Sequence, residues 1–257
     1  PYIREALDSM NADVEYIRGA DIKPDDVAYA DALIVRTRTR CDRHLLEGSR
    51  VEFVATATIG IDHLDTEWLD EAGIHWVNCP GCNASSVGQY VETSLMRIGI
   101  TSGAVVGIVG CGHVGKEVEI VCERLGLKTI INDPYIDDHS YVSLEEVVKH
   151  SDVITFHVPL TYKGEYPTYK MADRRFFDLL AARERPLECI INTCRGGVID
   201  EQALLDAMDA GIVKRAVIDT WENEPDINRR LLERADIATP HIAGYSADGK
   251  VKADNMV

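Results

Sequence analysis

The sequence predicts an α/β fold built from two domains, the larger of them doubly wound. Short β-branched runs alternate with amphipathic stretches of helical length from about residue 104 to residue 239, and the first hundred residues repeat this alternation more loosely. Strands that alternate with such helices are typical of a parallel sheet with helices on both faces. A chain of 257 residues is long enough for two such domains.

The predicted strands of the larger domain are short runs rich in valine and isoleucine. They are Ala104–Val109, Thr129–Asn132, Val153–His157, Cys189–Asn192, Ala216–Asp219 and Ile237–Thr239. The helices predicted between them are Val114–Leu125, Leu144–His150, Ala172–Ala182, Glu201–Ala210 and Asn228–Arg234. Ser143 and Glu146 make a capping box, which supports the start of the second of these helices.

The N-terminal region predicts a second, smaller α/β domain. Its strand-like runs are Ala32–Arg36, Phe53–Ala57 and His75–Asn78, and its helical stretches are Ile3–Ser9 and Thr66–Ala72. The segment Ser86–Ile98 predicts a linking helix, and another helix begins near Lys250. We therefore expect residues 1–88, completed by residues 245–257, to form the smaller domain and residues 89–244 to form the larger one.

Composition and charge exclude several classes of protein. A formal net charge of −16 disfavours non-specific binding to nucleic acid, which requires a basic surface. No apolar run approaches the roughly 20 residues that span a bilayer. The seven cysteines are odd in number and lie mostly inside apolar segments, so reduced thiols are expected. We expect a cytoplasmic protein that binds neither nucleic acid nor membranes.

The glycine-rich loop Gly110–Gly115 follows a buried type of strand and precedes a helix. Such glycines let a pyrophosphate approach the free N–H groups of the helix N-terminus. Asp133 lies 133 − 115 = 18 residues past the last glycine, at the end of the next strand, where a carboxylate accepts hydrogen bonds from the adenosine ribose. Its charge disfavours a 2′-phosphate, so NAD is expected rather than NADP. A glycine turn without a ligand fits this context less well.

Three polar residues, Arg195, Glu224 and His241, follow later strands of the same sheet. An imidazole can accept a hydroxyl proton near neutral pH, and a carboxylate bonded to its other nitrogen fixes the tautomer. An arginine offers a planar pair of donors to a substrate carboxylate. Each residue taken alone could have no catalytic role. His241 could be a structural loop histidine, Arg195 a surface residue and Glu224 part of a solvated acidic turn. Their shared position at strand ends favours one catalytic site.

Four ordered motifs resemble the D-2-hydroxyacid dehydrogenases. They are Gly110–Gly115, Asn192–Gly197, Asp219–Pro225 and Pro240–Gly244. The resemblance implies a Rossmann-type nucleotide domain, a flavodoxin-like α/β substrate domain, and catalysis by Arg195, Glu224 and His241. It also implies NAD contacts from Gly110, Gly112, His113, Val114, Gly115, Asp133, Val158, Thr193, Cys194, Asp219 and Gly244.

Other segments most resemble the branch of this family that oxidises 4-phospho-D-erythronate in pyridoxal phosphate biosynthesis. They are Thr56–His63, Pro80–Ala84, Gly164–Thr168 and His241–Tyr245. The resemblance implies substrate contacts from Thr37, Thr58 and Tyr245. It further implies a leading strand, a C-terminal dimerisation domain and a homodimer. Val158 departs from the branch, which can carry a threonine facing the cofactor there.

The run from Arg36 to Arg40 gives an indication of the substrate that does not depend on the family resemblance. In an extended segment alternate residues share a face, so Arg36, Arg38 and Arg40 predict a cationic row that could bind a phosphate. A solvated edge is an equally good interpretation for Arg38 and Arg40. Other substrates remain open, such as D-3-phosphoglycerate or another D-hydroxyacid, and so does a non-catalytic NAD-sensing regulator.

Two further patterns are set aside. The pair Cys79 and Cys82 has redox spacing but lacks the strand context of a thioredoxin-like unit. The eight histidines show no ligand spacing with cysteines or carboxylates apart from Asp62 and His63. No metal site is expected.

Overall fold

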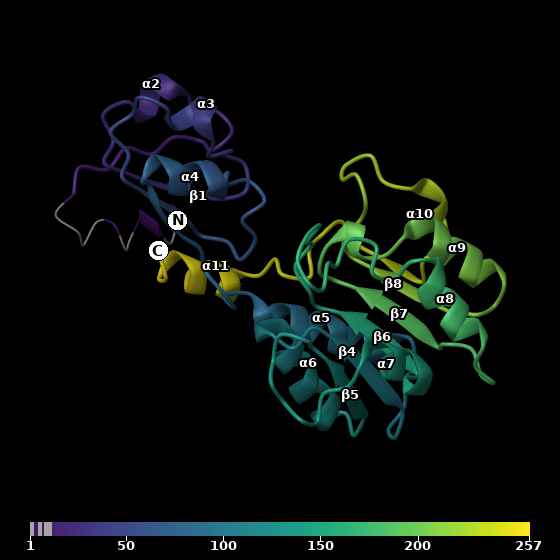
Figure 1. Ribbon diagram of the computed structural model, residues 1–257. Helices are drawn as coiled ribbons and strands as arrows, with labels where there is room; N and C mark the ends of the chain where they lie inside the picture. The colour runs from purple at the N-terminus through teal and green to yellow at the C-terminus, as the bar shows by residue number, and fades with distance from the viewer. Residues whose placement is uncertain (1–2, 5–6, 8–11) are drawn as a thin grey trace. The chain divides into compact units, whose positions relative to one another are not determined.

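The structure is a computed structural model that describes residues 3–4, 7 and 12–257. The chain divides into two compact units. The smaller unit comprises Pro1–Asn83 and Tyr245–Val257, and the larger unit comprises Ala84–Gly244 (Figure 1). The division predicted after residue 88 falls inside helix α5 (Ala84–Arg97), because that helix already starts at Ala84.

The larger unit contains a six-stranded sheet in which all neighbouring strands are parallel. Its strands are β4 (Val105–Val109), β5 (Lys128–Asn132), β6 (Val153–Phe156), β7 (Cys189–Asn192), β8 (Ala216–Ile218) and β9 (Ile237–Ala238). Their order across the sheet is β5-β4-β6-β7-β8-β9. The order reverses between β4 and β6, and ligands of such sheets bind outside the carboxyl ends of the strands at this switch point.

Helices cover both faces of this sheet. They are α5, α6 (His113–Arg124), α7 (Leu144–His150), α8 (Arg174–Ala181), α9 (Glu201–Asp209) and α10 (Arg229–Arg234), with a short 3-10 helix η1 (Gly196–Val198). One apolar cluster joins α5 and α6 to the sheet, and a second joins α7 through α10 to it.

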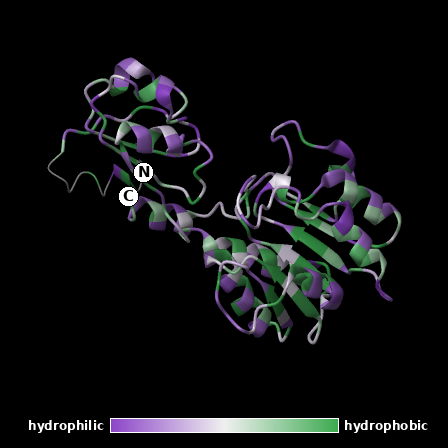
Figure 2. Ribbon diagram, in the orientation of Figure 1, coloured by the Kyte–Doolittle hydropathy of each residue, from purple (hydrophilic) through white to green (hydrophobic). Residues whose placement is uncertain are grey.

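Successive strand residues alternate between the two clusters: Ile190 belongs to the second and Ile191 to the first. Both faces of the central strands β4, β6, β7 and β8 are therefore buried, which explains the continuous apolar runs that Figure 2 shows in the sheet.

Short polar side chains fix the starts of several helices. Side-chain oxygens at the N-cap accept a hydrogen bond from an N–H group of the first turn, which would otherwise lack a partner. The N-cap residues are Ser143 for α7, Asp173 for α8, Asp200 for α9 and Asn228 for α10. These caps set where each helix begins and hence how long the loop from the preceding strand is.

The smaller unit has a three-stranded parallel sheet of β1 (Ala32–Val35), β2 (Phe53–Thr56) and β3 (His75–Val77), in that order. Its helices are α2 (Pro24–Val27), α3 (Arg43–Leu46), α4 (Thr66–Ala72) and α11 (Ala247–Asp254). Helix α11 packs through Ala253 against Ala57, Cys79 and Cys82. The last residues of the chain thus complete the unit formed by the first ones.

The predicted α/β class with parallel sheets is confirmed. Every strand predicted in the described residues is present within about one residue of its expected ends, and Leu144–His150 and Thr66–Ala72 match their helices. The helix predicted for Ile3–Ser9 falls mostly outside the described residues. Helices α2 and α3 were not predicted, because four residues are too few to show helical periodicity. The flavodoxin-like topology of the smaller unit stays a prediction.

Within the described part of the chain, no helix combines the length and the apolar character needed to cross a membrane.

Candidate active site

The glycine loop between β4 and α6 adopts a backbone that suits glycine. Gly110 has a φ of 88°, and a Cβ atom there would lie 2.7 Å from the carbonyl oxygen of His157. A Cβ atom on Gly115 would lie 2.2 Å from the carbonyl oxygen of Gly110. The two glycines therefore let the loop, the end of β6 and the first turn of α6 pack against each other.

Gly112 differs from these two glycines because its missing side chain leaves open space. A Cβ atom there would meet no atom within 4 Å. Gly112 is the N-cap of α6 and gives the helix no side-chain acceptor. The N–H groups of His113 and Val114, in the first turn, have no acceptor within the helix. An open approach to such N–H groups is what a pyrophosphate requires.

The carboxylate of Asp133 follows β5 and is held in place by backbone donors. Its Oδ2 atom accepts a hydrogen bond from the N–H of Cys111 at 2.8 Å, and its Oδ1 atom accepts one from the N–H of Tyr135 at 3.1 Å. A carboxylate has about four acceptor positions, so capacity remains for ribose hydroxyl groups. The bond to Cys111 ties this carboxylate to the glycine loop.

Side chains from the ends of β6 and β7 meet beside the same loop. Nδ1 of His157 lies 3.4 Å from Oγ1 of Thr193, and Nε2 lies 2.9 Å from Oγ1 of Thr155. Burial lowers the pKa of His157 to about 3, so the ring is neutral at physiological pH. Val158 Cγ1 would lie 2.7 Å from a Cβ atom on Gly110. Val158 therefore lies at the glycine loop, and Thr193 contacts His157, whose carbonyl group packs against that loop.

Cys194 is also at the end of β7, with its thiol turned into the protein. Its Sγ atom lies 3.2 Å from Oδ1 of Asn192, and burial raises the pKa of the thiol to about 11. The thiol is therefore neutral and a poor nucleophile.

A buried carboxylate, Asp219, holds the loop that follows β9. Its Oδ1 atom accepts hydrogen bonds from Thr239 Oγ1 at 2.6 Å and from the N–H of Ile242 at 2.8 Å. Its Oδ2 atom accepts one from the N–H of Ala243 at 2.9 Å, and its carbonyl oxygen accepts one from the N–H of His241 at 2.8 Å. These bonds fix the backbone on both sides of His241, and Gly244 follows directly.

His241 and Glu224 form a hydrogen-bonded pair. Nδ1 of His241 lies 2.9 Å from Oε2 of Glu224, and Oε1 of Glu224 accepts a hydrogen bond from the N–H of Trp221 at 2.8 Å. With Nδ1 donating to the carboxylate, Nε2 carries a lone pair and can accept a proton. The imidazole side chain is 46% exposed, so a ligand can reach it.

Arg195 lies on a loop that touches the Glu224 loop. A Cβ atom on Gly196 would lie 2.0 Å from the backbone carbon of Trp221, so only glycine permits this approach. The Nη1 atom of Arg195 donates to the carbonyl oxygen of Cys194 at 2.8 Å. Backbone packing and hydrogen bonds therefore connect the loops of Arg195, Glu224 and His241 into one assembly.

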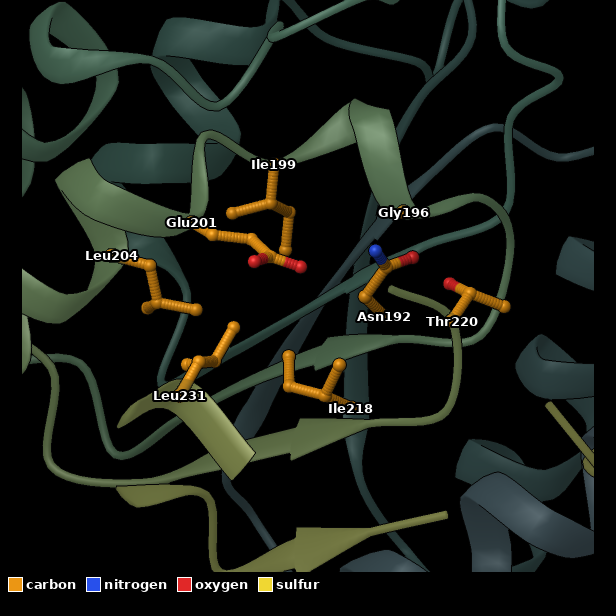
Figure 3. Close-up of a pocket in the computed structure, with 8 residues that line it drawn as sticks. All are labelled: Asn192, Gly196, Ile199, Glu201, Leu204, Ile218, Thr220 and Leu231. Carbon is orange, nitrogen blue, oxygen red and sulfur yellow. The ribbon is translucent and has the colours of Figure 1, made fainter. Parts of the chain in front are cut away.

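Behind these loops lies a small internal gap that supports them. Figure 3 shows its lining, which consists of Asn192, Gly196, Ile199, Glu201, Leu204, Ile218, Thr220 and Leu231. The gap has no room for a water molecule. Oε1 of Glu201 accepts a hydrogen bond from the N–H of Glu222 at 2.8 Å, and burial raises the pKa of this carboxyl. Glu201 thus braces the loop that carries Glu224.

In the smaller unit, the sequence-predicted substrate residues Thr37 and Thr58 lie on loops after β1 and β2, and Tyr245 lies two residues before α11. Oγ1 of Thr58 donates to the carbonyl oxygen of Gly60 at 2.8 Å and lies 2.8 Å from Oγ1 of Thr56. Thr37 lies in a turn after β1, in which the N–H of Thr39 donates to the carbonyl oxygen of Arg36 at 3.2 Å.

That turn overturns the predicted arginine row. Residues 36–40 are not extended, so alternate side chains do not share a face. Arg36 Nη1 lies 3.0 Å from Asp254 Oδ1, and Arg40 Nε lies 2.9 Å from Asp42 Oδ2. The expectation failed because the strand ends at Val35 and a turn replaces it.

Among the described residues, the geometry supports neither a redox role for Cys79 and Cys82 nor a metal site. All seven cysteines are free and buried. Burial raises the pKa of Cys79 to about 11, the opposite of an activated redox thiol. Among residues 3–4, 7 and 12–257, no group of three or more potential ligands could hold a metal ion.

Comparison with known proteins places this geometry in a family. Residues 83–243 match the model of the D-isomer specific 2-hydroxyacid dehydrogenase, NAD binding domain. The chain is 49% identical over 265 residues to an erythronate-4-phosphate dehydrogenase of Bacteroides fragilis, covering 100% of this chain and 75% of that protein. The chain belongs to the D-2-hydroxyacid dehydrogenase family, in its erythronate-4-phosphate dehydrogenase branch. An erythronate-4-phosphate dehydrogenase of Porphyromonas gingivalis is 43% identical over 265 residues, covering 100% of this chain and 71% of that protein.

Solved structures agree with this family in fold. The cofactor (NAD+) bound 3-phosphoglycerate dehydrogenase of Entamoeba histolytica has a TM-score of 0.79 at 26% identity, covering 98% of this chain and 86% of that chain. The Aquifex aeolicus D-lactate dehydrogenase complexed with NAD and lactic acid has a TM-score of 0.78 at 23% identity, covering 100% of this chain and 89% of that chain. The predicted family, fold class and NAD cofactor are confirmed.

The residues present fit NAD in this dehydrogenase. Because Gly112 has no side chain, open space remains through which a pyrophosphate can approach the N-terminus of α6. A Cβ atom at this position would occupy that space. Asp133 offers remaining acceptor positions at the end of β5. Together they provide for the pyrophosphate and for the adenosine ribose.

Sequence reasoning missed two residues that brace the dehydrogenase site, His157 and Glu201. The signal for Glu201 was its place directly after the N-cap Asp200, at the start of a predicted helix. Its burial is visible only in the structure. For His157 the only signal was its place at the end of a buried strand.

Proposed function

We propose that this chain catalyses the NAD-dependent oxidation of 4-phospho-D-erythronate at its C2 hydroxyl group to the 2-oxo acid, a step of pyridoxal phosphate biosynthesis. The observation that carries the reaction type is the His241–Glu224 pair, whose 2.9 Å contact leaves Nε2 as a proton acceptor. The names of the relatives at 43% and 49% identity support the substrate.

The chain's own residues divide the chemistry. His241 Nε2 takes the proton from the C2 hydroxyl group as the C2–H bond breaks, and Glu224 accepts the hydrogen bond from Nδ1 that becomes stronger as the ring gains charge. Arg195 binds the substrate carboxylate and, in the reverse direction, polarises the keto oxygen. NAD+, when bound, accepts the hydride that leaves C2.

The NAD contacts follow from the loops of the larger unit. The first turn of α6 and Gly112 would hold the pyrophosphate, and Asp133 would accept hydrogen bonds from the ribose and repel a 2′-phosphate. The other residues expected to contact NAD lie at the same strand ends or support the loops there. They are Thr193, Val158, Cys194, Asp219 and Gly244.

We also propose that the protein works in the cytoplasm as a homodimer. The seven free, buried thiols are compatible with a reducing compartment. The homodimer rests on resemblance to the family, and the oligomeric state of the protein in solution tests it.

The substrate is tested by measuring NADH formation with 4-phospho-D-erythronate, D-3-phosphoglycerate and D-lactate as alternatives. We expect kcat/KM to be highest for 4-phospho-D-erythronate. A higher kcat/KM for D-3-phosphoglycerate would reassign the substrate within the family. Binding of NAD without turnover of any hydroxyacid would instead indicate a regulator.

A further inference from the structure

The exposed phenol of Tyr245 lies in a cluster of cations in the smaller unit. Tyr245 is 71% exposed, and Nζ of Lys250 lies 3.5 Å from its ring centroid. The pKa of Tyr245 is lowered, first by a hydrogen bond from Lys250 and then by the charges of Lys250, Arg36 and Arg38. Three cations therefore share the surroundings of one hydroxyl group.

These three cations differ in what compensates their charge. Arg36 Nη1 lies 3.0 Å from Oδ1 of Asp254, whose side chain is only 9% exposed. A buried carboxylate requires a partner, so the charge of Arg36 is already used to neutralise Asp254. Among the residues that the structure describes, Arg38 and Lys250 form no ion pair, so their charges remain available to a ligand.

The cluster is held on a fixed backbone. Lys250 and Asp254 are four residues apart on α11 and so lie on the same side of the helix. The side of α11 that binds Arg36 therefore also carries Lys250. The carbonyl oxygen of Ala253 lies 3.3 Å from Sγ of Cys79, which attaches the helix to the rest of the unit.

The turn that carries Arg38 is fixed in the same way. Oγ1 of Thr39 donates to the carbonyl oxygen of Gly19 at 2.9 Å, and the N–H of Thr39 donates to the carbonyl oxygen of Arg36. Both the helix and the turn are thus positioned before any ligand binds, which reduces the entropy cost of binding.

A phosphate monoester matches this cluster in charge and in hydrogen bonding. The dianion needs about two positive charges and donors for its three terminal oxygens. Arg38 and Lys250 supply the charges, and the phenol of Tyr245 supplies a further O–H donor. In a protein of net charge −16, such a local excess of cations is what an anionic substrate requires.

We propose that Arg38, Lys250 and the hydroxyl group of Tyr245 bind the phosphate group of the substrate. Arg36 instead holds α11 in place through Asp254. This inference rests on the proposed function, and it makes Lys250 the residue that distinguishes a phosphorylated hydroxyacid from its unphosphorylated counterpart.

The test compares Lys250→Met with the wild type on 4-phospho-D-erythronate and on D-erythronate. The measured quantity is the preference, the ratio of kcat/KM for the phosphorylated acid to kcat/KM for the unphosphorylated one. Loss of a charged donor should lower this preference about 10- to 100-fold. Lys252→Met is the matched control, because Lys252 is exposed on the same helix and carries the same charge; it should keep the wild-type preference.

The outcomes separate the subsite from the proposed function. A wild-type preference for the phosphorylated acid that Lys250→Met retains would overturn the subsite and leave the function standing. A wild type without any preference would overturn both. An equal loss in Lys252→Met would show a long-range charge effect and also overturn the subsite.

If Lys250→Met does not fold, a second measurement still tests the proposed phosphate subsite. Inorganic phosphate should inhibit the wild type competitively against the phosphorylated acid, and Arg38→Gln, on the separate turn, should raise its inhibition constant about 10-fold. An unchanged inhibition constant in Arg38→Gln would contradict the proposed subsite.

Discussion

The two units hold their functional side chains by different means. In the larger unit, His241 is fixed through its own backbone and its neighbours, which bond to the buried Asp219. In the smaller unit, Arg38 lies in the turn after β1, Lys250 lies on α11 and Tyr245 lies just before α11. An Arg36–Asp254 pair connects the turn to the helix.

This difference follows the chemistry that each unit performs. Proton transfer requires atoms placed to within a fraction of an ångström, which a hydrogen-bonded backbone provides. Recognition of a phosphate needs mainly charge and donors, which flexible cationic side chains supply. We infer that the larger unit determines the rate and the smaller unit determines the choice of substrate.

The largest expected effect is on the catalytic base. His241→Ala should lower kcat about 10²- to 10⁴-fold, because the proton acceptor is lost. Titration with NAD, followed by protein fluorescence, should give a wild-type dissociation constant. A wild-type rate would show that another group takes the proton, and a lost NAD site would show that the residue acts on the cofactor instead.

The next largest effect is expected at Asp219, which holds the loop that carries His241. Asp219→Asn replaces an acceptor of three hydrogen bonds with an amide, so it should lower the free energy of unfolding by about 2–4 kcal/mol. Chemical denaturation measures this loss. Asp137→Asn, on an exposed loop, is the control and should change stability little. Equal stability of the two variants would mean that the loop of His241 is held by other contacts.

A smaller effect distinguishes two glycines of the same loop. Gly112→Ala places a methyl group in open space, so it should raise the dissociation constant of NAD about 10- to 100-fold without lowering the melting temperature of the free protein. Gly110 has a φ of 88°, which residues other than glycine rarely adopt, so Gly110→Ala should lower that melting temperature. If Gly112→Ala binds NAD normally, the open space does not serve the pyrophosphate.

The smallest effect is a pH dependence at His157. Burial lowers the pKa of His157 to about 3 in the folded state, while an unfolded histidine titrates near pH 6.5. Between these values the unfolded chain binds the extra proton, so stability falls as the pH is lowered, by at most about 1.4 kcal/mol per pH unit.

His157→Gln should therefore reduce the slope of unfolding free energy against pH between about pH 5 and 6.5. His150→Gln, on an exposed helix position, is the control. Equal slopes in wild type and His157→Gln would show that His157 is hydrated enough to be protonated in the folded protein.

The sequence revealed the larger unit more completely than the smaller one, for physical reasons. Its central strands are buried on both faces, so their apolar runs are clear, and Arg195 and His241 follow within three residues of the ends of β7 and β9. The phosphate cluster depends instead on contacts between distant residues: Arg36 and Asp254 are 218 positions apart. The turn after Val35 was also hidden, because Arg-Thr repeats suit an extended strand as well as a turn.

The most direct test of the division of labour is a double-mutant cycle of His241→Ala and Lys250→Met. It measures kcat/KM on 4-phospho-D-erythronate and on D-erythronate for the four proteins. We expect His241→Ala to lower both values about 10²- to 10⁴-fold while the preference stays within about twofold, and Lys250→Met to lower the preference about 10- to 100-fold in either background. If His241→Ala changed the preference as much as Lys250→Met does, rate and substrate choice would not reside in separate units.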